Sequence, residues 1–171
     1  MQAALRALNQ LVADAVISQY AIGGAIGASF YIEAVQTEDV DAFVFMSPSA
    51  SGLRTLAPIY EALQKLGGVV EKEYVRFAEW PVQILPDAND LVREAIHEAV
   101  TTHFDDIPTR IFTAEHLCAV ALQTGRAKDF LRVVMFLEAN AVDRPLLEAM
   151  LKRHSIERKL ARVDSLMKDS Q

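Results

Sequence analysis

The sequence predicts an α+β protein in which a mixed β-sheet flanked by helices is followed by a helical C-terminal subdomain. Strand-like apolar runs alternate with helical patterns as far as about residue 112. Turn-forming segments, such as the Ser/Pro-rich stretch 47–52 and the pair Gly67-Gly68, separate them. Beyond Thr113 every segment has helical spacing. We therefore expect an α/β core over residues 1–112 and a helical subdomain over residues 113–171 packed on it.

The first 112 residues contain both kinds of element. Leu5, Leu8 and Leu11 recur at helical spacing, so the chain begins with a helix that covers one face of the sheet. Pro58 either kinks a later helix or marks its true first turn. The expected order is helix 2–17, strand 20–22, helix 25–33, strand 39–46, loop 47–52, helix 53–66, strands 69–77 and 79–85, helix 88–100 and an edge strand at 109–112.

Capping residues divide the rest of the chain into helices. Thr113 is a plausible N-cap, and Gly125 separates the helix it begins from the next one. Asp143, with Pro145 two residues later, marks another start, and Ser155 a last one.

Composition limits the class of protein. The chain has 171 residues, enough for one domain or for a catalytic domain with a small helical appendage. No apolar run approaches 18 residues and no export signal is visible, so we expect a cytoplasmic protein without a membrane span. Cys118 is the single cysteine, which excludes an internal disulfide, and its pattern places it in the core. The oligomeric state does not follow from the sequence.

The charge is unevenly distributed. The formal net charge is −6, but residues 126–171 carry 10 Lys+Arg against 7 Asp+Glu, whereas residues 1–125 carry 7 against 16. A basic helical appendage suits a polyanion such as RNA, although scattered Lys and Arg on exposed helix faces explain the same count.

One stretch combines a glycine turn with paired acids. Gly23 and Gly24 follow a short apolar run, and a helix beginning at Gly24 would direct free N–H groups toward an anion. Asp39 and Asp41 enter the next apolar run two residues apart, so on a strand their carboxylates share a face. Such a pair suits Mg²⁺ or Mn²⁺ bound together with substrate phosphates. The alternative is a solvated turn that leads into an ordinary core strand.

These residues resemble the signature of the nucleotidyltransferase superfamily, in which an apolar residue and Gly-Gly precede an Asp-x-Asp strand by about one helix. Ile22, Gly23, Gly24, Asp39 and Asp41 match it. In addition, Thr37 fits the Thr-x-Asp-x-Asp form of bacterial minimal nucleotidyltransferases and abortive-infection type toxins. The resemblance implies a nucleotidyltransferase-like sheet, a bound nucleoside triphosphate and a role related to toxin–antitoxin systems.

A second match lies in the helical part. Glu115-His116-Leu117, followed by Arg126-Ala127-Lys128-Asp129, resembles a stretch found after the sheet in the abortive-infection type proteins. The resemblance implies that Arg126 or Lys128 contacts phosphate. The alternative is a helix-start salt bridge that joins the two subdomains.

Several positions depart from the family pattern. Gln83 stands where a third carboxylate is common, and an amide is a neutral ligand that cannot act as a base. Glu79 is a poor substitute, because at ~3.3 Å per residue it lies roughly 13 Å along the strand unless the strand bends at Pro81. Arg132 replaces a second acid, and Val35 replaces a basic residue.

The four histidines show no metal-binding i, i+4 spacing, so the sequence does not predict a zinc centre. The resemblance places His116 near the cleft, where we expect a structural hydrogen bond.

Two functions remain open. In the first, the protein is an enzyme that transfers a nucleoside monophosphate to a hydroxyl group of a protein, an RNA or a small molecule. Asp39 and Asp41 would then bind the metal, and Gly23, Gly24, Thr37, Gln83, Arg126 and Lys128 the nucleotide. In the second, Gln83 marks lost chemistry, and the protein is a nucleotide-binding or protein-interaction module.

Overall fold

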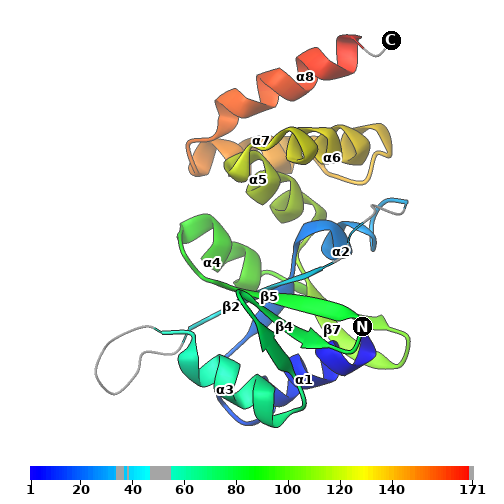
Figure 1. The fold of residues 1–171 in the computed structure, drawn as a ribbon. Helices are drawn as coiled ribbons and strands as arrows, with labels where there is room; N and C mark the ends of the chain where they lie inside the picture. Colours follow the sequence, from blue (N-terminus) through cyan, green and yellow to red (C-terminus); the bar gives the residue numbers. More distant parts are fainter. Residues whose placement is uncertain (34–36, 38, 47–54, 170–171) are drawn as a thin grey trace.

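The computed structural model describes residues 1–33, 37, 39–46 and 55–169 and confirms the α+β prediction. A mixed sheet lies between two groups of helices (Figure 1). In the described part of the chain the strands are β1 (Tyr20–Ile22), β2 (Val40–Val44), β3 (Val69–Glu71), β4 (Tyr74–Phe77), β5 (Trp80–Pro86), β6 (Val100–Phe104) and β7 (Ile107–Ile111). The helices are α1 (Gln2–Ala13), α2 (Gly24–Ala28), α3 (Ala57–Lys65), α4 (Asp90–His97), α5 (Ala114–Thr124), α6 (Ala127–Glu138), α7 (Arg144–Arg153) and α8 (Leu160–Asp169), with a 3₁₀ turn, η1 (Glu157–Lys159), before α8.

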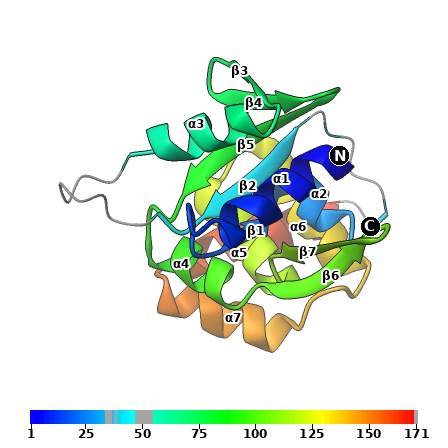
Figure 2. The same ribbon diagram turned by 90° about the horizontal axis from the view of Figure 1, so that it is seen from below.

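The strand order is β3-β4-β5-β2-β1-β7-β6, which Figure 2 shows from below. β2 runs parallel to β5 and antiparallel to β1, whereas β1 runs parallel to β7. The carboxylate-bearing strand β2 is therefore an interior strand whose neighbours are fixed on both sides.

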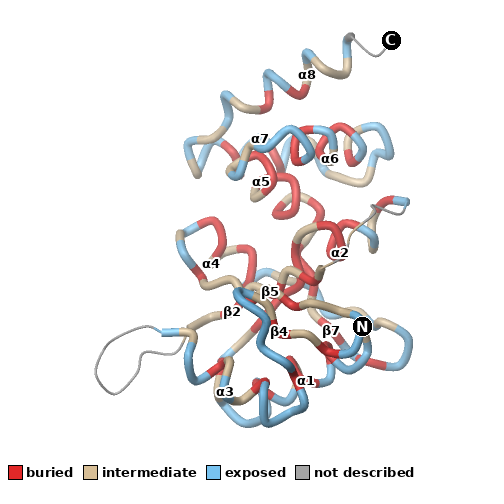
Figure 3. Tube along the Cα trace, viewed as in Figure 1, coloured by how far each residue is buried: buried red, intermediate tan, exposed pale blue. Residues whose placement is uncertain are grey.

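Each face of the sheet has its own core. α1 and α3 cover one face, where Leu5, Leu8 and Leu11 are buried against the strands. α2, α4 and the helices α5 to α8 build the other core, and buried residues line the inner sides of these helices in Figure 3. The helices that follow Thr113 thus pack on the sheet side that α2 and α4 cover, while the division into two parts at residue 112 stays a prediction.

The caps of the C-terminal helices follow the sequence signals. The Thr113 hydroxyl accepts a hydrogen bond from the His116 amide, and Gly125 ends α5 in the left-handed conformation with φ +75°. Asp143 caps α7 by accepting from the Leu146 amide at 3.0 Å. Ser155 itself begins no helix: the 3₁₀ turn and α8 follow it.

Two segments differ from the prediction because tight turns interrupt them. The expected strand 69–77 is the hairpin β3–β4, which reverses at Lys72 with φ +57°. The expected helix end at residue 100 is the start of strand β6, which turns at Asp105 (φ +53°) into β7. β6 is therefore the edge strand, and β7, predicted as an edge, lies inside the sheet beside β1.

Several helix bounds are shorter than predicted. α1 ends at Ala13 and α2 at Ala28, while α3 begins at Ala57 with Pro58 in its first turn, which supports the second interpretation of that proline. The predicted loop 47–52 lies outside the described residues. Within the described segments, no helix combines the length and the apolar character needed to cross a membrane.

Candidate active site

A row of polar side chains crosses three neighbouring strands. Asp39 and Asp41 both line one cavity of about 870 Å³, as their two-residue spacing predicts. The parallel register pairs Asp41 with Gln83 on β5, and the antiparallel register pairs Gln83 with Tyr74 on β4. Gln83 and Tyr74 line the same cavity. We call this space the carboxylate cavity.

The helical subdomain supplies the opposite wall. Lys128 and Arg132 come from α6, and Arg126 precedes the first residue of that helix. From the sheet side, Thr37 also lines the cavity, and its hydroxyl donates to Asp39 Oδ1 at 2.9 Å. Of the predicted site residues, Thr37, Asp39, Asp41, Gln83, Arg126 and Lys128 therefore all surround one space.

The Gly-Gly turn supports Asp41 directly. Gly24 has φ +56°, and a Cβ atom at this position would lie 1.8 Å from Asp41 Oδ2. The Gly23 amide donates to the Asp41 carbonyl oxygen at 3.0 Å. Gly23 does not line the carboxylate cavity or the cavity next to it, and a Cβ atom at this position would meet Phe43 and Phe112. The Asp41 carboxylate thus occupies the space where a side chain at position 24 would lie.

The charges in the cavity oppose one another. Burial raises the pKa of the Asp41 carboxyl group above its ordinary value, and the nearby charge of Asp39 raises it further. Arg132, Arg126 and Lys128 act in the opposite direction on that pKa. The site therefore combines two repelling carboxylates with three cations.

Asp129 organises two of these cations. Its side chain is 1% exposed and accepts from Arg126 Nε at 2.7 Å, and Arg132 Nη1 lies 3.7 Å from its Oδ1. Arg126 does form a salt bridge at a helix start, but its partner lies in α6 itself, so this bridge does not join the two subdomains as the alternative predicts. Arg126 also lines the cavity. Arg132 Nε is buried and has no hydrogen-bond partner among the described residues.

A second cavity adjoins the first. It measures about 420 Å³ and shares Asp41, Gln83, Arg126 and Arg132 with the carboxylate cavity. Its further walls are largely apolar and include Phe43, Leu85, Val92, Phe112 and Leu117, with Gly24 at the edge nearest Asp41. The carboxylate cavity and this largely apolar cavity therefore meet at the paired residues Asp41 and Gln83.

Some residues considered from the sequence lie elsewhere. Glu79 lines an adjoining cavity of about 380 Å³, which shares Thr37, Arg76 and Pro81 with the carboxylate cavity, so the structure does not place Glu79 beside Asp39 and Asp41 as a third acid. Cys118 is fully buried in α5, where burial raises the pKa of its thiol, in agreement with a core role. Val35 lies outside the described residues.

Sequence reasoning missed Arg132 and Tyr74. Arg132 was noted only as a departure from the family, although its position one turn after Lys128 predicts the same helix face. Tyr74 enters the site because the β4–β5 hairpin pairs it with Gln83, a register that the sequence analysis did not predict.

His116 also differs from expectation. Its Nδ1 lies 2.8 Å from the Thr113 hydroxyl, as a structural hydrogen bond requires, but His116 does not line the carboxylate cavity. It lies instead beside Glu94 and Glu98, so one histidine does belong to a group of possible metal ligands.

Comparisons with solved structures give the fold a name. The chain aligns with an antigenic nucleotidyltransferase-like protein from Paracoccidioides brasiliensis with a TM-score of 0.56, 14% identity, and coverage of 96% of this chain and 90% of that one. It aligns with the antibiotic-resistance factor ANT(2'')-Ia with a TM-score of 0.53, 13% identity, and coverage of 98% and 97%. The chain has a nucleotidyltransferase fold. No protein-family model and no curated protein sequence matches it.

The nucleotidyltransferase fold agrees with the resemblance drawn from the Gly-Gly and Asp-x-Asp motifs. At these identities the likeness concerns the fold. Roles of individual residues must therefore be argued from the cavity itself.

Proposed function

We propose that this protein is a nucleotidyltransferase that binds a nucleoside triphosphate in the carboxylate cavity and transfers the nucleoside monophosphate to a hydroxyl group of a protein, an RNA or a small molecule. The observation that carries the proposal is the convergence of Asp39, Asp41, Arg126, Lys128 and Arg132 on one cavity of about 870 Å³. The nucleotidyltransferase fold supports it.

The donor set fits one Mg²⁺ or Mn²⁺ ion. Asp39 and Asp41 offer hard oxygen ligands in one cavity, and their mutual repulsion would be relieved by a cation. When bound, such an ion neutralises phosphate charge and lowers the pKa of an attacking hydroxyl. Gln83 supplies no third carboxylate, so the residues favour one ion rather than two.

Arg132 would supply part of the positive charge that a second metal ion would otherwise provide. It replaces an acid in the family pattern, it is 12% exposed, and its Nε lacks a partner in the described structure. A guanidinium group in this position would bind phosphate oxygens and stabilise the charge that develops on them. Arg126 and Lys128 would complete the phosphate-binding wall.

The transfer itself needs little covalent chemistry from the protein. The acceptor oxygen would form a bond to the α-phosphorus, the bond from that phosphorus to the bridging oxygen would break, and pyrophosphate would leave. Gln83 cannot accept the hydroxyl proton. A carboxylate oxygen of Asp39 or Asp41 that does not bind the ion is the acceptor that the cavity offers.

A second candidate function keeps the binding and drops the chemistry. Gln83 at the third acid position favours a nucleotide-binding or protein-interaction module, as in a regulatory or toxin–antitoxin pair of the cytoplasm. The enzyme and the nucleotide-binding module both predict nucleotide binding, and only the enzyme releases pyrophosphate.

Calorimetric titration with each nucleoside triphosphate, with and without Mg²⁺ or Mn²⁺, tests the site. We expect metal-dependent binding that the double variant Asp39→Asn/Asp41→Asn weakens at least tenfold, about 1.4 kcal/mol. Pyrophosphate release and transfer of an α-³²P label then separate the enzyme from the binder. Absence of binding by any triphosphate with either metal would reject the enzyme and the nucleotide-binding module and leave the protein-interaction module.

Arg132→Ala tests the phosphate-binding wall, with Arg158→Ala as its control. Arg158 is an exposed arginine on η1 that does not line the carboxylate cavity. We expect Arg132→Ala to weaken triphosphate binding about tenfold while Arg158→Ala leaves it unchanged. Equal affinities for the two variants would remove Arg132 from the site.

A further inference from the structure

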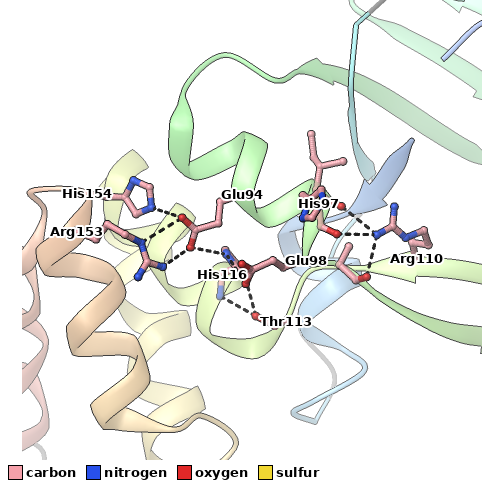
Figure 4. A network of polar contacts seen from close by, with 10 residues as sticks. Glu94, His97, Glu98, Arg110, Thr113, His116, Arg153 and His154 are labelled. Carbon is pink, nitrogen blue, oxygen red and sulfur yellow. Dashed lines mark hydrogen bonds and ion pairs between the residues drawn. The ribbon is translucent and has the colours of Figure 1, made fainter. Parts of the chain in front are cut away.

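Outside the carboxylate cavity, three potential metal ligands meet between α4 and α5 (Figure 4). Glu94 and Glu98 lie one helical turn apart on α4, and His116 faces them from the first turn of α5. One ligand atom from each residue lies within 4.8 Å of the others. The group joins a helix of the α/β part to a helix of the C-terminal part.

The two distances from His116 Nε2 to the acids exceed a normal hydrogen bond, and the shorter one matches the separation of two ligand atoms in a metal site. His116 Nε2 lies 3.4 Å from Glu94 Oε1 and 3.9 Å from Glu98 Oε2. Hydrogen bonds from N–H to oxygen are usually about 2.9 Å long. In a tetrahedral zinc site with bonds of about 2.0–2.1 Å, the ligand atoms are roughly 3.3 Å apart.

The His116 ring is oriented with a free nitrogen toward the acids. Its side chain is 1% exposed, and Nε2 has no hydrogen-bond partner in the described part of the chain. Nδ1 lies 2.8 Å from the Thr113 hydroxyl. If Nδ1 donates to Thr113, Nε2 carries the lone pair, which is the tautomer that a metal-binding histidine requires.

Glu94 is held in place from its other side. Arg153 donates to both Glu94 carboxylate oxygens, and His154 Nε2 lies 2.9 Å from Oε2 (Figure 4). Partners of this kind orient carboxylate ligands in metal sites. They come from the end of α7, so the group involves three helices.

The charge balance leaves room for a cation. Glu94 and Glu98 lie beside His116, and Arg153 is the one guanidinium group bonded to these two acids in the described structure. Two carboxylates opposed by one arginine leave a net negative charge that a divalent ion would compensate.

We propose that Glu94, Glu98 and His116 form a binding site for a divalent transition-metal ion, with zinc as the best fit and a water molecule as the fourth ligand. The ion would clamp α4 to α5 and, through the orientation of Glu94, to α7. The site is distinct from Asp39 and Asp41 and does not depend on the proposed transferase activity.

Titration of the untagged, metal-free protein with CoCl₂ and ZnCl₂ tests the site. We expect visible Co²⁺ absorption typical of four-coordination, displaced by one equivalent of Zn²⁺, and a rise in Tm of several degrees with ZnCl₂. The double variant Asp39→Asn/Asp41→Asn should keep both signals, since it alters the other acidic site. Their loss in that variant would assign them to the carboxylate cavity and overturn the proposal.

Glu98→Gln decides the ligand set. Glu98 is 55% exposed, so the substitution leaves the core intact, and Glu138→Gln is a matched exposed control. We expect at least tenfold weaker Zn²⁺ binding for Glu98→Gln and no change for Glu138→Gln. His116→Gln should abolish the Co²⁺ spectrum, and should that variant not fold, Glu98→Gln carries the test alone. Unchanged affinity in Glu98→Gln, or no Zn²⁺ binding by the wild-type protein, would overturn the proposal.

Discussion

Position 24 shows how one atom decides the geometry of the acidic pair. A side chain at position 24 would be strained by the φ of +56°, and its Cβ atom would lie 1.8 Å from Asp41 Oδ2. We predict that Gly24→Ala displaces Asp41, abolishes metal-dependent triphosphate binding and lowers the free energy of unfolding by more than the ~1–2 kcal/mol typical of a left-handed residue alone. Urea denaturation and calorimetry measure the two effects.

Gly67→Ala is the control for this substitution. Gly67 has φ +93°, but a Cβ atom there would meet nothing within 4 Å. The variant should lose about 1–2 kcal/mol through backbone strain and bind nucleotide as the wild type does. If Gly24→Ala behaves like Gly67→Ala, the contact with Asp41 has no role in binding.

At the scale of an element, the first turn of α6 keeps two cationic side chains of the cavity in position. Asp129 is buried and bonded to Arg126, with Arg132 close by. We predict that Asp129→Asn lowers the free energy of unfolding by about 1–2 kcal/mol, because a charged hydrogen bond is weakened. It should also weaken triphosphate binding several-fold, because Arg126 and Arg132 are no longer held. Chemical denaturation and calorimetry are the measurements.

Asp143→Asn provides the comparison for a helix start outside the cavity. Asp143 caps α7 through the Leu146 amide, and asparagine is an equally good N-cap. Stability and nucleotide binding should both stay near wild-type values. A similar loss of binding in both variants would point to a general effect of α6 and α7 rather than to the position of the arginines.

At the scale of the whole molecule, the sheet is protected in its middle and open at its sides. β1 is fully buried between β2 and β7, whereas β3 is exposed along its length and β6 is largely so. We predict that amide hydrogens of β1 and β2 exchange only with global unfolding, while those of β3 and β6 exchange at least a hundredfold faster. Hydrogen exchange followed by NMR measures this, and uniform protection across the sheet would contradict it.

The sequence predicts what depends on local periodicity. Residues two apart on a strand share a face, which correctly predicts that Asp39 and Asp41 line one cavity. The position of Gln83 near them followed from the family resemblance, and the register pairs it with Asp41. The cap signals at Thr113 and Gly125 were equally local. The roles of these side chains in binding stay predictions.

What the sequence did not predict depends on packing between distant elements. Glu94, Glu98 and His116 come from two helices, so no spacing along the chain reveals their proximity. The β6–β7 hairpin was missed because most of β6 is exposed, its residues alternate only weakly between apolar and polar, and its turn at Asp105 uses a left-handed residue other than glycine.

The pairing of the first helix with the late hairpin has a consequence for synthesis on the ribosome. Gln2 Nε2 donates to Asp105 Oδ2 at 2.7 Å, Asn9 Nδ2 donates to the Pro108 carbonyl oxygen at 2.8 Å, and Ile22 pairs with Ile111. In a nascent chain, α1 and β1 therefore lack their native contacts with the β6–β7 hairpin until residue 111 has been translated. During that interval the apolar face of α1 is an expected binding site for chaperones, and the N-terminal half cannot reach its native form ahead of the hairpin.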